Sequence, residues 1–108
     1  MIHELRIYHC VPGRLPALHE RFRNHTLGFW QKHGIRQLGF WTTLIGPTNH
    51  SLTYLLQWES LAEREQKWNA FQADQEWIKV RAASEATQSI VKSIENQILV
   101  PTDYSALK

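Results

Sequence analysis

Hydrophobic and polar residues alternate along four segments of the chain, a pattern that predicts β-strands. The four segments are residues 2–11, 35–45, 51–59 and 93–100. Pro12-Gly13 ends the first segment as a turn, and four turn-forming residues, Gly-Pro-Thr-Asn at 46–49, follow the second. The second and third strands are therefore expected to pair as an antiparallel hairpin.

Two segments between these strands have apolar residues at three- and four-residue spacing, which predicts amphipathic helices. The first helix is expected over residues 15–32, and Gly34 should end it because glycine easily adopts the left-handed conformation found after a helix. The second helix is expected to begin after Ser60, which forms a capping-box pattern with Glu63. Asp74 is expected to interrupt or re-cap this second helix.

The order of elements is strand, helix, strand, strand, helix, strand, which predicts a ferredoxin-like α+β fold. The sheet should have four antiparallel strands, and both helices should lie on one of its faces because crossover connections are right-handed. A chain of 108 residues has the usual length of one domain, so residues 1–108 are expected to form a single domain.

Bulky apolar side chains occur on both faces of the first strand. Leu5, Ile7 and His9 share one face, which we expect to point toward the helices. Arg6 and Tyr8 share the opposite face, which would then be open.

An open face that exposes Tyr8, Trp41 and Ile45 together would be an unusually large apolar patch for a monomer. We therefore expect two copies of the chain to pack sheet against sheet as a homodimer. Glu4 and Arg6 would then form a polar network between the subunits; the alternative for Arg6 is a site for an anionic ligand. The alternative is that the C-terminal tail or a helix of the same chain covers this face.

The formal net charge of +2 is too small, and the Lys and Arg residues are too scattered, to indicate a nucleic-acid partner. Cys10 is the only cysteine, which excludes a disulfide within the chain and favours a reducing compartment. No segment has the apolar length of a signal peptide or a membrane span. We therefore expect a cytoplasmic protein with no membrane partner.

Five short segments occur in a defined order: Glu-Leu-Arg-Ile-Tyr at 4–8, His-Gly-Ile at 33–35, Gly-Phe-Trp-Thr-Thr at 39–43, Ile-Gly-Pro-Thr-Asn at 45–49 and Trp-Glu-Ser-Leu-Ala-Glu-Arg-Glu at 58–65. In this order and spacing they resemble the NIPSNAP family. The resemblance extends over residues 2–101 and implies a dimeric α/β barrel. It implies no agreed enzymatic mechanism, and therefore no set of catalytic residues.

The candidate for acid–base chemistry is His9, expected at the end of the first strand on the helix-facing side. The alternative is a histidine that packs at the sheet edge with local hydrogen bonds. Tyr8, Trp30 and Trp41 are candidates for the lining of a ligand pocket, and the alternative for the tryptophans is the hydrophobic core.

The histidines of the first helix do not predict a metal site. His19, His25 and His33 are spaced by six and eight residues, whereas metal-ligand pairs on a helix are three or four residues apart. The sequence also contains no glycine-rich phosphate loop. We therefore expect neither a metal nor a cofactor.

Two functional hypotheses follow. In the first, the protein binds a small apolar or aromatic molecule in a cleft between sheet and helices and converts it without a cofactor, by oxygenation or isomerisation. In the second, it is an interaction or scaffold module without chemistry, linked through the resemblance to trafficking or stress response. Enzymes share this fold with proteins of other functions, so the fold does not decide between them.

Overall fold

The alternating segments form a four-stranded antiparallel sheet. The computed structural model describes all 108 residues of the chain. Its strands are β1 Ile2–Cys10, β2 Arg36–Thr42, β3 Ser51–Trp58 and β4 Val91–Leu99. They lie in the order β2-β3-β1-β4 across the sheet. The predicted strands and the ferredoxin-like order are confirmed, with strand ends that differ from the predicted ones by up to three residues.

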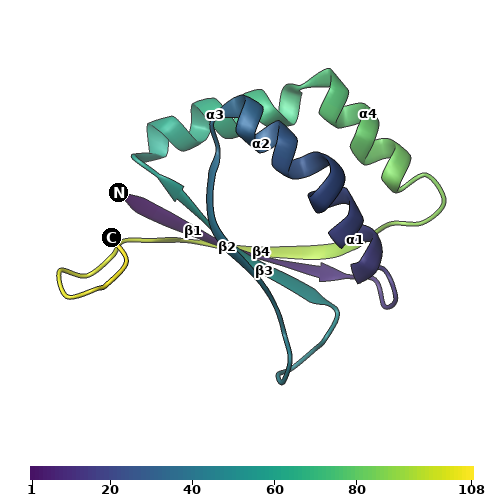
Figure 1. Cartoon of the computed structure of the whole chain (residues 1–108), viewed down its shortest axis with the longest axis horizontal. Coiled ribbons are helices and arrows are strands. Elements are labelled where there is room, and N and C mark those ends of the chain that lie inside the picture. The colour runs from purple at the N-terminus through teal and green to yellow at the C-terminus, as the bar shows by residue number, and fades with distance from the viewer.

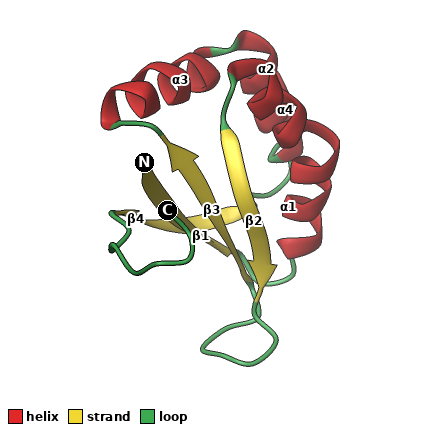
Figure 2. Ribbon diagram, turned by 60° about the vertical axis from the view of Figure 1, so that its left-hand side comes forward, coloured by secondary structure: helices red, strands yellow, loops and turns green.

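The helices all lie on one face of the sheet (Figures 1 and 2). They are α1 Leu15–Arg21, η1 Phe22–Thr26, α2 Leu27–His33, α3 Leu61–Ala73 and α4 Gln75–Ser84. None of them combines the length and apolar character that crossing a membrane requires.

Local sequence signals determine the helix ends as predicted. The Ser60 side chain accepts a hydrogen bond of 3.1 Å from the backbone N–H of Glu63 and caps α3. Asp74 separates α3 from α4 and accepts a hydrogen bond of 3.0 Å from the backbone N–H of Glu76. Gly34 ends α2 with a φ of 71°, in the left-handed region that glycine adopts without steric cost.

The first helical segment contains a turn of π-helix, η1, that the sequence pattern does not predict. Such turns are rare and occur frequently at functional sites. Phe22 and Thr26, at the two ends of η1, are both buried, and the Thr26 hydroxyl donates a hydrogen bond of 3.3 Å to the carbonyl oxygen of Arg21. The π-turn therefore turns these two side chains toward the interior.

The face of β1 beneath the helices is the opposite of the predicted one. Glu4 is buried and contacts Arg64 of α3, and the ring of the buried Tyr8 packs 6.0 Å from the ring of Phe22. His9 alternates with these residues and lies on the other face. The predicted orientation is wrong because alternation shows which residues share a face, not which face the helices cover.

The other face of the sheet is largely uncovered. It includes the half-buried side chains of Leu5, Ile7 and Leu55. The C-terminal tail reaches only one end of it: the carbonyl oxygen of Lys108 accepts a hydrogen bond of 3.4 Å from the Gln57 side chain. Figure 1 shows the two chain termini close together at this end.

Candidate functional site

A cleft of about 430 Å³ lies between the sheet and the helices. Five of its 15 lining residues are aromatic: Tyr8, Phe22, Trp30, Phe71 and Trp77. Its charged members are Arg6, Arg21, Arg81, Glu85 and Lys92. The volume is within the range of pockets that bind small molecules.

Glu4 lies fully buried behind this cleft and accepts hydrogen bonds from four side chains. Arg64 donates two, of 2.8 and 3.0 Å, and Arg6 donates one of 2.9 Å. The Trp58 indole and the Asn96 amide each donate one of 3.1 Å. Burial by itself would raise the pKa of Glu4, but these hydrogen bonds, first that from Arg64, lower it to about 2.

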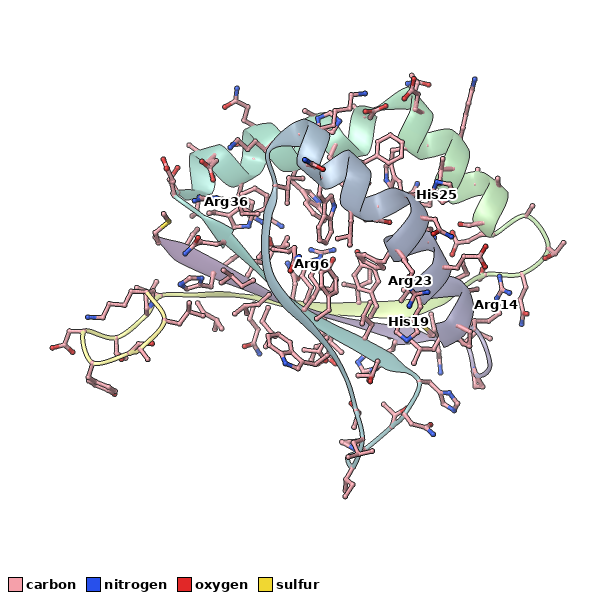
Figure 3. The ribbon with its side chains drawn as sticks, viewed as in Figure 1. Arg6, Arg14, His19, Arg23, His25 and Arg36 are labelled. Atoms are coloured by element: carbon pink, nitrogen blue, oxygen red, sulfur yellow. The ribbon has the colours of Figure 1, made fainter.

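Glu4 therefore stays ionised and holds Arg6 in place between the sheet and the helices (Figure 3). The prediction that Glu4 and Arg6 form a polar network between subunits is wrong. Their network lies inside one chain, beneath the helices.

A hydrogen-bond chain of defined direction links Arg6 to the cleft. Arg6 Nε donates to the Tyr54 hydroxyl over 2.8 Å, and the Tyr54 hydroxyl donates to that of Tyr8 over 2.9 Å. The first bond has this direction because a guanidinium can only donate, and the Tyr54 proton is then available for the bond to Tyr8. Burial raises the pKa of Tyr54 well above its ordinary value, so Tyr54 keeps the proton that it donates. The proton of Tyr8 is not used in this chain and is free for a molecule in the cleft.

Other donors in the cleft wall lack an acceptor. The indole N–H groups of Trp30 and Trp77 and the Nε–H of Arg21 are buried without a hydrogen-bond partner. Arg21 is held by its Nη1, which donates to the Ser84 hydroxyl over 3.2 Å and lies 4.0 Å from the Glu85 carboxylate. Burial lowers the pKa of Arg21, and the charge of Glu85 partly opposes this. These three N–H atoms are buried within the wall and are not exposed in the cleft itself.

The structure places two of the sequence-predicted pocket residues, Tyr8 and Trp30, in the cleft wall. It does not bring His9 to them. His9 lies on the open face of the sheet, where its Nε2 pairs with the carboxylate of the exposed Glu95. The prediction that His9 points into the cleft is therefore wrong. Nowhere are three His, Cys, Asp or Glu side chains grouped as metal ligands.

Trp41, the third predicted pocket residue, lies on the edge strand β2 and is 54% exposed. Its ring packs over the backbone of Gly39, where a Cβ atom would lie 2.8 Å from the indole. Trp41 lines a separate groove of about 320 Å³ with Phe40 and His19. It does not contribute to the cleft between sheet and helices.

Arg21 is a cleft residue that the sequence analysis missed. The available signal was its helical position: Arg21 follows Leu18 by three residues and precedes Phe22, so it lies beside the apolar stripe. An arginine at such a position is easily interpreted as part of the solvent-facing side. The π-turn after it, which the pattern does not reveal, places Phe22 and Thr26 in the same wall.

The NIPSNAP family model matches residues 3–106 of the chain. The chain belongs to the NIPSNAP family. A NIPSNAP family protein from Agrobacterium tumefaciens has a TM-score of 0.87 and 26% identity, with 99% of this chain and 98% of that chain covered. A NIPSNAP-like domain protein from Burkholderia xenovorans has a TM-score of 0.84 and 25% identity, with 96% and 87% covered. No curated protein matches the chain.

The fold of this NIPSNAP chain also occurs in more distant proteins. A proposed antibiotic biosynthesis monooxygenase from Chloroflexus aurantiacus has a TM-score of 0.54 and 11% identity, with 94% of this chain and 96% of that chain covered. This likeness shows a common fold alone, because one fold supports many unrelated functions.

Proposed function

We propose that this NIPSNAP protein binds a small aromatic or apolar molecule in the cleft and donates a hydrogen bond to it from Tyr8. The observation behind this proposal is the Tyr8 hydroxyl, which lines the cleft and is oriented by Tyr54 at 2.9 Å with its own proton free. An aromatic wall with a few oriented polar groups is typical of small-molecule sites. An open cleft also favours binding over the scaffold hypothesis, which predicts a filled one.

Stabilisation of negative charge on a bound oxygen, without a cofactor, is the chemistry that this arrangement supports. A bound molecule with an oxygen atom next to Tyr8 would receive the hydrogen bond at that oxygen. A donor that is held in position stabilises negative charge as it develops on an enol or phenol oxygen. Isomerisation and cofactor-free oxygenation both proceed through such charge.

Tyr8→Phe tests this role with 2-naphthol as the probe. We expect the variant to bind 2-naphthol about fivefold to tenfold more weakly than the wild type, because it lacks one oriented hydrogen bond. Isothermal titration calorimetry measures the affinity. Tyr104→Phe, which makes the same change at a residue that is 85% exposed in the tail, should bind like the wild type. Equal affinities for Tyr8→Phe and the wild type would contradict the role of Tyr8.

The open face of the sheet supports a second part of the proposal, a homodimer. Leu5, Ile7 and Leu55 form an apolar surface there that no helix covers, and Trp41 lies 54% exposed on the edge strand. Two such faces packed together would remove this apolar area from water in both copies. A symmetric pair is also the commonest assembly of soluble proteins.

Ile7→Glu should convert the proposed dimer into a monomer at micromolar concentration. Two copies of the glutamate would each be buried in the interface without a partner, and such a contact costs several kcal/mol. Light scattering gives the mass directly. Leu61→Glu on α3, where the leucine is 62% exposed, is the matched control and should remain a dimer. A monomer mass for the wild-type protein would refute the dimer.

A further inference from the structure

We infer, building on the proposed function, that the molecule bound in the cleft is an aromatic anion, specifically a carboxylate on a one- or two-ring system. Three properties of the cleft wall support this substrate class: its hydrogen-bond donors, its excess of positive charge and its aromatic surface. None of these properties depends on the open face or on the dimer.

The donors that line the cleft favour a ligand that supplies acceptors. Arg21, Arg81 and Lys92 are lining residues whose side chains can only donate hydrogen bonds. A carboxylate offers two oxygens with about four acceptor positions and no competing donor. The carboxylate of the ligand would also accept a hydrogen bond from the Tyr8 hydroxyl.

The charges of the wall are unbalanced. Arg6 is neutralised by Glu4, but three further cations, those of Arg21, Arg81 and Lys92, line the cleft. The single carboxylate of the wall, Glu85, is 4.0 Å from Arg21 and is also used to accept a hydrogen bond from a backbone N–H. The positive excess attracts an anion, and an anion would balance it where a neutral molecule would not.

The remaining surface of the cleft selects for a flat, apolar body. Trp30 and Phe22 pack edge to face at 5.5 Å between ring centroids, and Phe71 and Trp77 pack at 4.9 Å. A further ring could join either pair, with a gain beyond its buried area. The volume of about 430 Å³ leaves room for one or two fused rings and a carboxylate.

The test compares 2-naphthoate with 2-naphthamide, which has the same rings without the charge. In calorimetry at low salt we expect 2-naphthoate to bind at least about tenfold more tightly, because hydrogen bonds to a charged group are the stronger ones. The difference should shrink as salt is added, because salt screens the charges of the exposed Arg81 and Lys92.

Charge-removing variants locate the site. Arg21→Gln and Arg81→Gln should each weaken 2-naphthoate binding about threefold to tenfold and change 2-naphthamide binding by less than about twofold. Arg81 is exposed, so its variant remains informative even if the buried Arg21 proves necessary for folding. Arg23→Gln is the matched control, since Arg23 lies on η1 two residues after Arg21 but outside the cleft wall (Figure 3).

The indole N–H signals in ¹H–¹⁵N NMR spectra report whether the aromatic probe lies beside the rings of Trp30 and Trp77, which line the cleft. Saturating 2-naphthoate should shift the signals of Trp30 and Trp77, assigned by substituting each tryptophan with phenylalanine, and leave that of the exposed Trp41 in place.

Equal binding of 2-naphthoate and 2-naphthamide in the cleft would contradict the inference that the ligand is an anion, and would leave the proposed function standing. Unchanged indole signals with undiminished binding in both arginine variants would place the probe elsewhere and overturn the inference. Failure of 2-naphthoate, 2-naphthamide and 2-naphthol alike to bind would contradict the proposed function itself.

Discussion

Glu4→Ala is expected to lower the free energy of unfolding by about 3–5 kcal/mol, the largest effect of any single polar substitution in this protein. The carboxylate of Glu4 is 0% exposed and accepts hydrogen bonds from Arg6, Arg64, Trp58 and Asn96. Its removal leaves the charge of Arg6 buried without a counter-ion and several donors without an acceptor. Denaturation by urea, at one fixed protein concentration because assembly contributes to stability, measures the loss.

Glu65→Ala is the control, because Glu65 is exposed on α3, and its free energy of unfolding should stay within about 0.5 kcal/mol of the wild type. The pH dependence gives a second check. Folding lowers the pKa of Glu4 from 4.5 to about 2, so its stabilisation is complete above about pH 4.5 and declines as the pH falls toward 2. Between pH 6 and pH 3 the wild type should lose about 2 kcal/mol that Glu4→Gln does not lose. Parallel pH profiles would contradict this account of Glu4.

Trp30→Ala is expected to lower the free energy of unfolding by about 3–5 kcal/mol. The side chain is 1% exposed, and its ring lies 5.3 Å from that of Tyr54 and 5.5 Å from that of Phe22. These partners come from β3 and η1, so alanine would leave a cavity where the sheet meets the helices. The same urea measurement applies.

Trp41→Ala is the matched control, because it removes the same side chain from a position that is 54% exposed. Both variants should be compared in the Ile7→Glu background, so that the proposed dimer makes no contribution. There we expect Trp41→Ala to cost about 1 kcal/mol or less. Equal losses for the two tryptophans would contradict the assignment of Trp30 to the core and of Trp41 to the surface.

Tyr8 and Glu4 connect the stability of this protein to its cleft. Glu4 holds Arg6, Arg6 donates to Tyr54, and Tyr54 orients the hydroxyl of Tyr8. A change at Glu4 should therefore also alter the orientation of the Tyr8 hydroxyl in the cleft, although the Glu4 carboxylate does not line the cleft. The buried polar network beneath the helices thus has two consequences, a stable core and an oriented donor.

The sequence by itself determined the elements and their order. Alternation and helical spacing depend on neighbouring residues, and so do the end signals at Ser60, Asp74 and Gly34, which all function as predicted. Together with the right-handed crossover rule, these local features were enough to predict the ferredoxin-like sheet with its helices on one face.

Only the tertiary structure decided which face the helices cover, and with it the site. Both faces of β1 contain apolar residues, so alternation alone could not choose between them, and His9 was assigned to the wrong one. Glu4 is charged and is therefore expected near a surface until its partners are known. Those partners, Arg64 and Asn96, are separated from it by 60 and 92 residues in the sequence. Long-range hydrogen bonds of this kind stabilise a buried charge, and they cannot be predicted from the spacing of neighbouring residues in the sequence.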